Sequence, residues 1–204
     1  KNILKGVATD GHRLAQVKLK IPNGADGMPA IIIPRKTVNE LRKLIEETDG
    51  DIAIIVSKNK IRFNVNNCVL TSKLIDGTFP DYQRVIPKEN SNKLQVLTKD
   101  FKDAVDRVST ISMEKTRAVK LEIKNKSLVL KVNNSEIGNA VEELSIDFEG
   151  DELEIGFNSK YLLDIASQIQ GSKIQFSLSD SSSPALITDE EQEGTIFVLM
   201  PMRV

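Results

Sequence analysis

Residues 94–108 read LQVLTKDFKDAVDRV, a short strand-like run followed by the beginning of an amphipathic helix. In the second part of the stretch, Phe101, Ala104, Val105 and Val108 stand at positions i, i+3, i+4 and i+7. This spacing places the four side chains on one face of an α-helix. The stretch therefore predicts a strand that leads directly into a helix with one buried face.

Two further stretches of the chain repeat this pattern. Residues 31–45 read IIIPRKTVNELRKLI and residues 153–169 read LEIGFNSKYLLDIASQI, so the pattern recurs about every 60 residues. Each copy has a strand-like run, then a polar or proline-containing turn, then a helical pattern. The expected core-facing residues are Val38, Leu41, Leu44 and Ile45 in the first copy and Leu162, Ile165, Ala166 and Ile169 in the third.

Strand and turn signals follow each predicted helix. In residues 118–124, for example, Val119, Leu121 and Ile123 alternate with charged residues, which is typical of a half-buried strand. The repeating unit is therefore β-α-β-β-β, present two and a half to three times. This order predicts an α+β fold in which the helices share one face and antiparallel sheets form the other.

The best candidate for a linker is the polar stretch PKENSNK at residues 87–93. It divides the chain into residues 1–88 and residues 89–204. The second part holds two full units, whereas the first holds one unit and a remnant. We therefore expect the chain to be a fragment with one incomplete and one complete domain.

The bulk composition limits the classes of function. The chain has 204 residues, of which 40% are hydrophobic, and its net charge is −1, so no global positive field attracts nucleic acid. No apolar run approaches the roughly 20 residues that a membrane helix needs, and no signal peptide is recognisable, which predicts a cytosolic protein without membrane contact. A single cysteine and a single histidine cannot form a structural zinc site. We expect neither metal nor cofactor, and we expect Cys68 to be a small buried hydrophobe.

The only histidine lies in the stretch ATDGHRLA at residues 8–15. A hydrolase could use His12 with Asp10 or Asp81, but the common nucleotide-binding, zinc-protease and serine-hydrolase motifs are absent from the sequence. Asp10 and Gly11 are more typical of a tight turn, in which glycine tolerates a positive φ.

Five separated motifs occur in unbroken order: ATDGHRLA, IIIPRK from residue 31, TSKLIDGTFPDYQRV from residue 71, EIGFNSKYLLD from residue 154 and VLMPMRV from residue 198. Together they closely resemble the bacterial DNA polymerase III beta subunits, the replicative sliding clamps. That resemblance implies a DNA clamp fold, with sheets outside and helices lining the inner face of a ring. It also implies a non-enzymatic processivity factor, with this chain covering the later part of the second domain and the whole third domain.

The resemblance further implies a pocket in which polymerases and other clients insert a short peptide. Partners would be polymerase subunits, the clamp loader and other proteins that carry a clamp-binding motif. The residues carried over by motif are Thr9, Gly11, His12, Arg13, Leu14, Pro80, Arg84, Val85, Asn158, Tyr161, Ser182, Pro184, Val198, Met200, Pro201, Met202 and Arg203.

The resemblance also implies sequence-independent contacts with double-stranded DNA and a homodimeric ring. Arg35 and Lys36 match DNA-facing positions of the family, and helix polarity extends the set to Arg42, Lys43, Lys102 and Arg107. The alternative interpretation of these charges is a solvated helix face. Thr110 and Ile111 would help to meet the neighbouring subunit. A peptide-binding adaptor that never touches DNA, and the hydrolase based on His12, remain the competing hypotheses.

Overall fold

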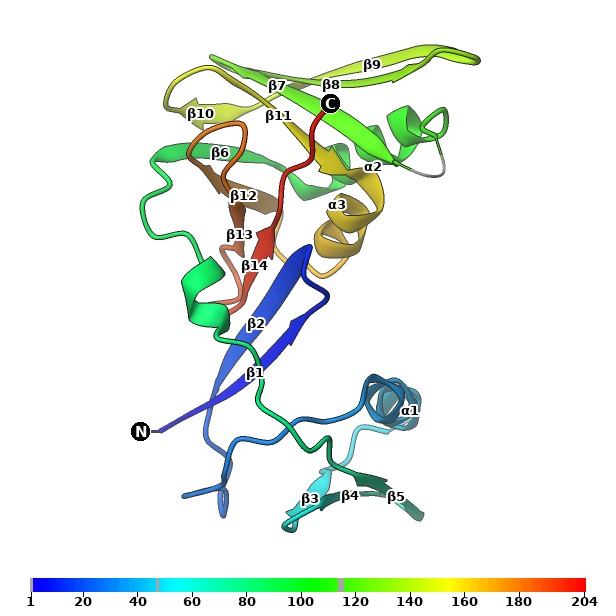
Figure 1. Cartoon of the computed structure of the whole chain (residues 1–204), viewed down its shortest axis with the longest axis vertical. Helices are drawn as coiled ribbons and strands as arrows, with labels where there is room; N and C mark the ends of the chain where they lie inside the picture. The colour runs from blue at the N-terminus through cyan, green and yellow to red at the C-terminus, as the bar shows by residue number, and fades with distance from the viewer. Residues whose placement is uncertain (1, 47, 114–115) are drawn as a thin grey trace. The chain divides into compact units, whose positions relative to one another are not determined.

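The computed structural model describes residues 2–46, 48–113 and 116–204, and the chain divides into two compact units (Figure 1). The smaller unit comprises residues 21–81, and the larger unit comprises residues 1–20 together with residues 82–204. Each unit has its own hydrophobic core. The first 20 residues thus join a unit most of which lies more than 60 residues further along the chain. The boundary expected after residue 88 stays a prediction.

The smaller unit packs one helix against a three-stranded antiparallel sheet of order β3-β4-β5. The helix is α1 (Arg35–Glu46), and the strands are β3 (Ala53–Val56), β4 (Lys60–Val65) and β5 (Cys68–Lys73). Alternate residues of β4, Ile61, Phe63 and Val65, are buried and form the centre of the core. This period of two is expected of a strand with one buried face.

The first repeat is less regular than the sequence predicts. Residues 31–34 form no strand, although the Ile75 N–H donates to the Ile32 carbonyl at 2.9 Å. Pro34 has no N–H to donate to a ladder. On α1, the core-facing positions expected at Val38 and Ile45 are 49% and 37% exposed. The prediction of a strand before α1 and of these two core residues was therefore wrong.

The prediction that Cys68 is buried was also wrong. The residue is exposed, because it pairs with Val65 at the turn end of the β4–β5 hairpin, where Asn66 takes a positive φ of 50°. We expect the folded protein to react fully with a thiol reagent such as Ellman's reagent, since the thiol is open to solvent. Absorbance of the released thiolate measures the reaction, and Cys68→Ser is the blank. A reaction that begins only after denaturant is added would contradict the exposed position.

The larger unit is built on two antiparallel sheets. One sheet has seven strands in the order β1-β2-β14-β13-β12-β6-β10, and the other has four in the order β11-β7-β8-β9. The strands of the first are β1 (Ile3–Thr9), β2 (Arg13–Lys20), β6 (Asn92–Leu97), β10 (Asp147–Glu149), β12 (Lys173–Leu178), β13 (Ala185–Asp189) and β14 (Ile196–Leu199). Those of the second are β7 (Ala118–Lys124), β8 (Ser127–Asn134), β9 (Gly138–Ser145) and β11 (Leu153–Asn158).

Two helices of the larger unit, α2 (Thr98–Ser109) and α3 (Ser159–Ala166), pack against each other and against these sheets (Figure 1). The four predicted core residues of α2 are all buried, and Phe101 meets Phe176 of β12 edge to face at 5.3 Å between ring centroids. The helical periodicity in residues 94–108 is thereby confirmed. Repeated β-α-β-β-β units with antiparallel sheets, the predicted α+β class, are the observed fold.

Residues 87–93, expected to be a linker, are tied to the larger unit. The side-chain amide of Asn90 donates to the carbonyls of Ser177 and Pro184 at 2.8 and 2.9 Å, and that of Asn92 donates to the Ser179 carbonyl at 3.0 Å. β6 begins at Asn92, inside the stretch. Asparagine side chains suit this role because they can replace backbone partners at a strand end. Within the described residues, no helix has the length and apolar character needed to cross a membrane.

Candidate functional site

The tip of the β1–β2 hairpin is a turn closed by its own side chains. The Asp10 carboxylate accepts hydrogen bonds from the backbone N–H groups of His12 and Arg13 at 3.0 and 3.1 Å. Thr9 Oγ1 donates to the Arg13 carbonyl at 2.8 Å, and Gly11 has a φ of 87°. An aspartate that binds the N–H groups two and three residues later is a common device of such turns. The predicted Asp-Gly turn is confirmed.

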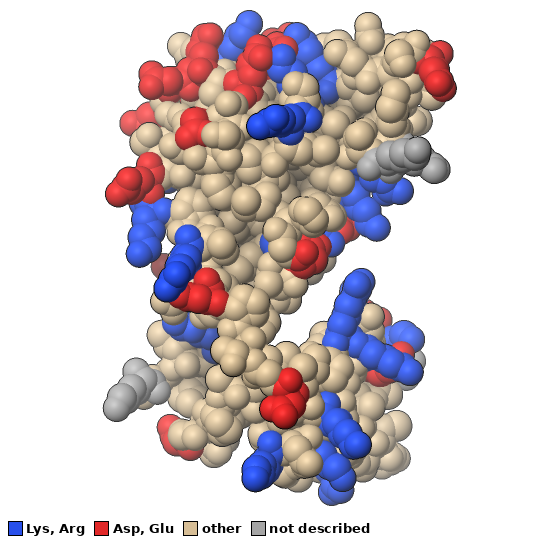
Figure 2. All heavy atoms as spheres, viewed as in Figure 1, with Lys and Arg blue, Asp and Glu red and all other residues tan. Residues whose placement is uncertain are grey.

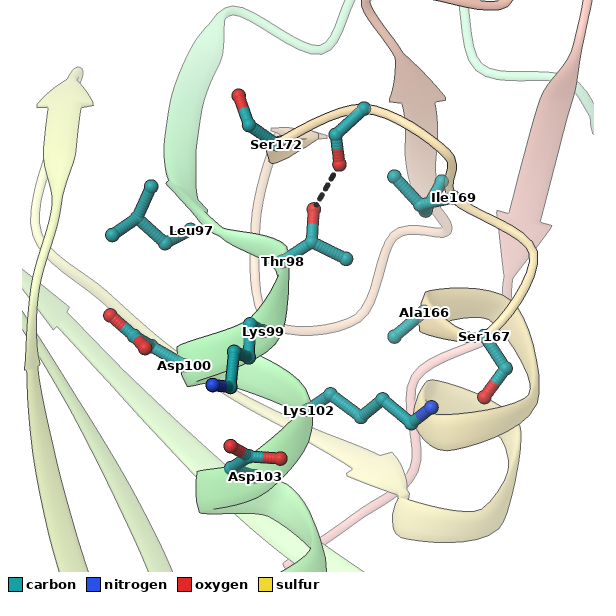
Figure 3. A pocket seen from close by; sticks show the side chains of 11 residues that line it. Leu97, Thr98, Lys99, Asp100, Lys102, Asp103, Ala166, Ser167, Ile169 and Ser172 are labelled. Atoms are coloured by element: carbon teal, nitrogen blue, oxygen red, sulfur yellow. Dashed lines mark hydrogen bonds between the residues drawn. The ribbon is translucent and has the colours of Figure 1, made fainter.

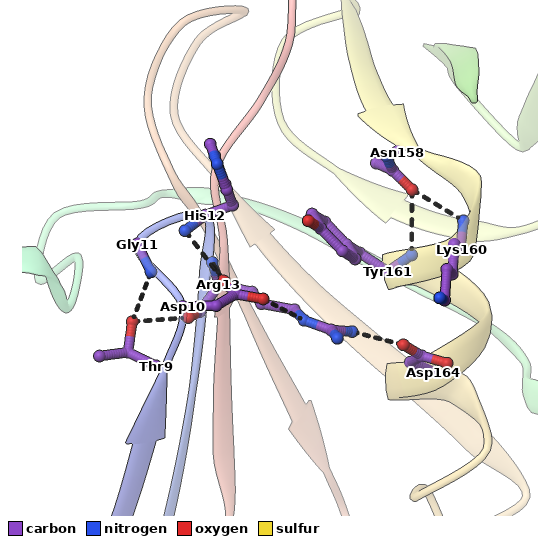
Figure 4. A network of polar contacts seen from close by, with 9 residues as sticks. All are labelled: Thr9, Asp10, Gly11, His12, Arg13, Asn158, Lys160, Tyr161 and Asp164. Carbon is purple, nitrogen blue, oxygen red and sulfur yellow. Dashed lines mark hydrogen bonds and ion pairs between the residues drawn. The ribbon is translucent and has the colours of Figure 1, made fainter. Parts of the chain in front are cut away.

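Arg13 connects this tip to α3. Its guanidinium Nη1 lies 2.6 Å from Asp164 Oδ2, and its Nε lies 3.1 Å from Asp10 Oδ2 (Figure 4). The same guanidinium carbon lies 4.2 Å from the centre of the Tyr161 ring, within the range of a cation–π contact. One side chain from β2 is therefore held between two carboxylates and against an aromatic face, a combination for which a planar guanidinium is suited.

The N-terminus of α3 supplies the aromatic face. Asn158 is the N-cap of the helix, and its Oδ1 accepts hydrogen bonds from the N–H groups of Lys160 and Tyr161 at 3.0 and 3.4 Å. Such a cap satisfies backbone donors that the helix leaves without partners. The Tyr161 ring points toward the hairpin tip in Figure 4 and stacks near the ring of His12, with centroids 6.4 Å apart and planes 25° apart.

Residues 200–204, here called the C-terminal segment, run past the same place. Immediately before them, β14 pairs with β2 so that Val198 faces Leu14. The Met200 N–H then donates to the His12 carbonyl at 2.9 Å, and the Met202 N–H donates to the Gly156 carbonyl of β11 at 2.9 Å. The segment thus joins the hairpin tip to β11, and Met200 is 40% exposed beside it.

The electrostatics of the tip depend on Asp10. Partial burial acts to raise the pKa of its carboxyl, but hydrogen bonds from the His12 N–H and from the Arg13 side chain and N–H outweigh burial and hold the pKa below the ordinary value of 3.8. Because the pKa is lower in the folded state, the stabilisation that Asp10 provides is fully present above pH 3.8 and is lost as pH falls through the folded pKa.

We therefore expect the hairpin tip to keep its structure down to a pH below 3.8, and to loosen only as Asp10 takes up a proton. An NMR titration that follows the Asp10 carboxyl carbon and the His12 and Arg13 amides measures this. Asp10→Asn, which removes the charge, provides the comparison. A midpoint for Asp10 at or above its ordinary value would contradict the hydrogen-bonded turn.

The hypothesis of a His12–Asp10 catalytic pair finds no support in this geometry. The Asp10 carboxylate binds the backbone N–H of His12 rather than its ring, and its remaining contact is with Arg13. The His12 ring stacks near Tyr161 instead. Among residues 2–46, 48–113 and 116–204, no group of three histidine, cysteine or acidic side chains is placed to hold a metal ion.

The remaining predicted peptide-binding residues lie on other elements. Pro80 is near the end of the smaller unit, and Arg84 and Val85 belong to a short 3-10 helix, η1 (Tyr82–Val85), in the larger unit. Ser182 and Pro184 lie in the loop between β12 and β13, where Asp180 accepts hydrogen bonds from the backbone and hydroxyl of Ser182. Their membership of one pocket with His12 stays a prediction. The contacts described above unite Thr9, Gly11, His12, Arg13, Leu14, Asn158, Tyr161, Val198, Met200 and Met202.

The predicted DNA-facing cations differ in how far they are already paired. On α1, Arg42 lies 2.9 Å from Glu46 and Lys43 lies 3.3 Å from Glu40, whereas Arg35 and Lys36 stand in the first turn. Cations in a first turn oppose the helix dipole, so this position favours binding of an external anion. Figure 2 shows basic side chains at the surface over α1, with acidic ones among them.

On α2, the guanidinium of Arg107 makes a two-pronged ion pair with Glu142 of β9, at 2.5 and 2.9 Å. Lys102 instead borders a shallow groove of about 590 Å³ between the start of α2 and the end of α3, which is also lined by Thr98, Ala166 and Ile169 (Figure 3). Arg107 is therefore less available than Lys102 to an external phosphate. Both remain predicted DNA contacts.

The expected subunit contact at Thr110 and Ile111 lies just after α2. The Asn134 side chain donates to the Ile111 carbonyl at 2.8 Å, and Ile111 packs against the main core. Nearby in the fold, β9 forms one edge of the four-stranded sheet and exposes Val141 by 61%. An uncovered edge strand with apolar side chains is suited to pairing with another chain.

Sequence reasoning missed two residues that organise this site, Asp164 and Gly156. It assigned Asp10 to the turn but did not predict the ion pair of its carboxylate with Arg13. Asp164 stands three residues after Tyr161, which on a helix puts the two side chains on neighbouring positions of one face, and this spacing was an available signal. Gly156 stands inside a strand-like run, which indicates the close approach of another part of the chain, but the sequence does not show which part.

Comparisons with known proteins agree with the geometry. The family described as DNA polymerase III beta subunit, central domain, matches residues 1–81, and the C-terminal domain of the same subunit matches residues 83–203. The beta sliding clamp of Caulobacter vibrioides is 48% identical over 201 residues, which are 98% of this chain and 54% of that protein. This chain spans about half the length of the curated relatives it matches.

Solved structures give the same result. A sliding clamp (DNA polymerase III subunit beta) from Bartonella birtlesii, bound to griselimycin, matches 99% of this chain and 55% of that one, with 56% identity and a TM-score of 0.95. A clamp from Pseudomonas aeruginosa bound to griselimycin has 38% identity and a TM-score of 0.90, with 100% of this chain and 55% of that one covered.

Proposed function

Because the chain belongs to the DNA polymerase III beta subunit family, we propose that it is part of a sliding clamp, a non-catalytic subunit that tethers polymerases to DNA. The observation that carries this proposal is the joining of the hairpin tip, α3 and the C-terminal segment around Arg13 and Tyr161. The full-length protein would close as a homodimer around duplex DNA. Residues 1–88 would be the later part of its second domain and residues 89–204 its third.

The peptide pocket is the first half of this function. His12, Tyr161 and the methionines of the C-terminal segment would form one apolar side of a groove, and Pro80, Arg84, Val85, Ser182, Pro184, Pro201 and Arg203 would complete it. Methionine side chains adapt to different aliphatic and aromatic anchors, which suits a site that serves several clients. Clients would include polymerase subunits and the clamp loader. A dissociation constant near micromolar, about −8 kcal/mol, would permit exchange between them.

Titration of the chain with a short fluorescein-labelled peptide that carries one aliphatic and one aromatic anchor residue, read by fluorescence polarisation, tests the pocket. We expect saturable binding that griselimycin displaces, since related clamps bind that compound. His12→Ala should weaken binding without abolishing it, whereas a hydrolase that depended on His12 would lose its activity altogether. Absence of any displacement by griselimycin would argue against the pocket.

Retention on DNA is the second part of the proposed function. Arg35, Lys36 and Lys102 would contact phosphates, which carry no base information and therefore allow sliding. The full-length protein, loaded on nicked circular DNA with its clamp loader, should stay bound in gel filtration and leave once the DNA is linearised. An adaptor that never touches DNA would not be retained on either form.

A further inference from the structure

Gly156 lies in the middle of β11, and nothing about its backbone requires glycine. It is buried between Ile155 and Phe157, which are themselves buried, and it pairs with Lys120 of β7. Its φ is outside the left-handed region, unlike that of Gly11. A glycine inside a strand weakens the strand, so its presence usually marks the close approach of another part of the chain.

The close approach is that of the C-terminal segment. A Cβ built on Gly156 would lie 2.5 and 2.6 Å from the two methyl carbons of Val204 and 2.6 Å from the carbonyl oxygen of Met202. Cβ atoms essentially never come within 3.0 Å of such neighbours, and one of these contacts is backbone that cannot rotate away. Even the smallest side chain at position 156 would therefore push the segment from its place.

A side chain at position 156 would break the contact that fixes the C-terminal segment at Met202. The Met202 N–H donates to the Gly156 carbonyl, and the two residues form an isolated antiparallel bridge. The segment is fixed at its other end by the Met200 N–H on the His12 carbonyl. Two backbone hydrogen bonds therefore hold Met200 and Met202 in place, and the Gly156 carbonyl accepts one of them.

We propose that Gly156 is a positioning residue of the peptide pocket: the absence of a side chain lets the C-terminal segment lie against β11 and holds Met200 and Met202 between the His12 carbonyl and β11. This inference rests on the proposed peptide-binding function. Gly156 touches no client. It acts through the segment, whose apolar side chains meet the client.

The test compares Gly156→Ala with Gly6→Ala in the 204-residue chain. Gly6 is a matched control because it is also a strand glycine without a positive φ, but no atom lies within 4 Å of a Cβ built there. Hydrogen exchange of the Met202 amide reports the seating of the segment. Affinity for the fluorescein-labelled peptide reports the pocket, and thermal unfolding reports the fold.

We expect Gly156→Ala to speed exchange at Met202 by about tenfold or more and to weaken peptide binding by about fivefold or more. Gly6→Ala should change neither. The amides of Ile155 and Phe157, which by strand alternation face β7, should keep their protection. Faster exchange at those two amides would mean that β11 itself had opened, and would overturn the proposal. Unchanged exchange at Met202, or a released segment with full peptide affinity, would overturn it as well. If the unaltered chain bound no peptide, the proposed function would fail first, and the role of Gly156 in the pocket with it.

Discussion

Replacing Arg13 by alanine is expected to weaken binding of the client peptide by about 3- to 150-fold. The change removes two ion pairs and a cation–π contact, each of which contributes about 0.2–1 kcal/mol at a partly exposed site. It also leaves the carboxylates of Asp10 and Asp164 without the cation that they share. The three losses together come to about 0.6–3 kcal/mol, and since tenfold in affinity is about 1.4 kcal/mol, they correspond to about 3- to 150-fold.

The effect is expected to act through the connection between β2 and α3. Arg13→Lys keeps the charge but lacks the planar fork that meets both carboxylates and the Tyr161 ring, so it should recover only part of the affinity. Arg62→Ala, an exposed arginine on β4 of the smaller unit, is the matched control and should have no effect. A double-mutant cycle with Asp164→Asn isolates the pair. Additive losses in that cycle, or unchanged affinity in Arg13→Ala, would contradict the role assigned to Arg13.

The elements that the sequence predicted well are those determined by local pattern. The buried face of α2 follows directly from the i, i+3, i+4, i+7 spacing, and the turn at Gly11 follows from the residue types beside it. The family motifs also selected Arg13 and Tyr161, which the structure brings within 4.2 Å. Local pattern was sufficient to predict structure where the contacting residues lie close in sequence. Motif was sufficient to select site residues that the family shares.

The predictions that were missed or wrong have a shared cause. In each, the burial or the contact of the residue depends on neighbours that its local sequence pattern does not include. Asp164 is 151 residues from Arg13, so no spacing rule could pair them. Cys68 stands in an apolar stretch, but its place at the end of a hairpin exposes it. Val38 fits a helical stripe, yet the three-stranded sheet covers only part of the α1 surface. Periodicity tells which residues share a face, and the packing partners decide how much of that face is buried.

The largest effect on stability is expected from Phe157→Ala. The Phe157 side chain is fully buried on β11, between Gly156 and the cap residue Asn158, so the change should cost about 3–5 kcal/mol of unfolding free energy in the larger unit. Phe157→Leu, which keeps most of the volume, should cost less than about 1.5 kcal/mol. Because the smaller unit has a separate core, hydrogen exchange of the α2 amides in increasing urea, which reports on the larger unit alone, is the appropriate measurement.

Phe157→Ala also tests whether the core under β11 supports the site, because Phe157 itself is not one of the predicted peptide-binding residues. At low urea, where the larger unit is still mostly folded, peptide affinity should fall with Phe157→Ala because the cap at Asn158 and the carbonyl of Gly156 both depend on the position of β11. Phe148→Ala is the comparison, since Phe148 is a partly buried residue of the short strand β10 in the other sheet. If Phe157→Ala cost less than about 1 kcal/mol, the β11 core would not be the platform on which α3 and the C-terminal segment are held.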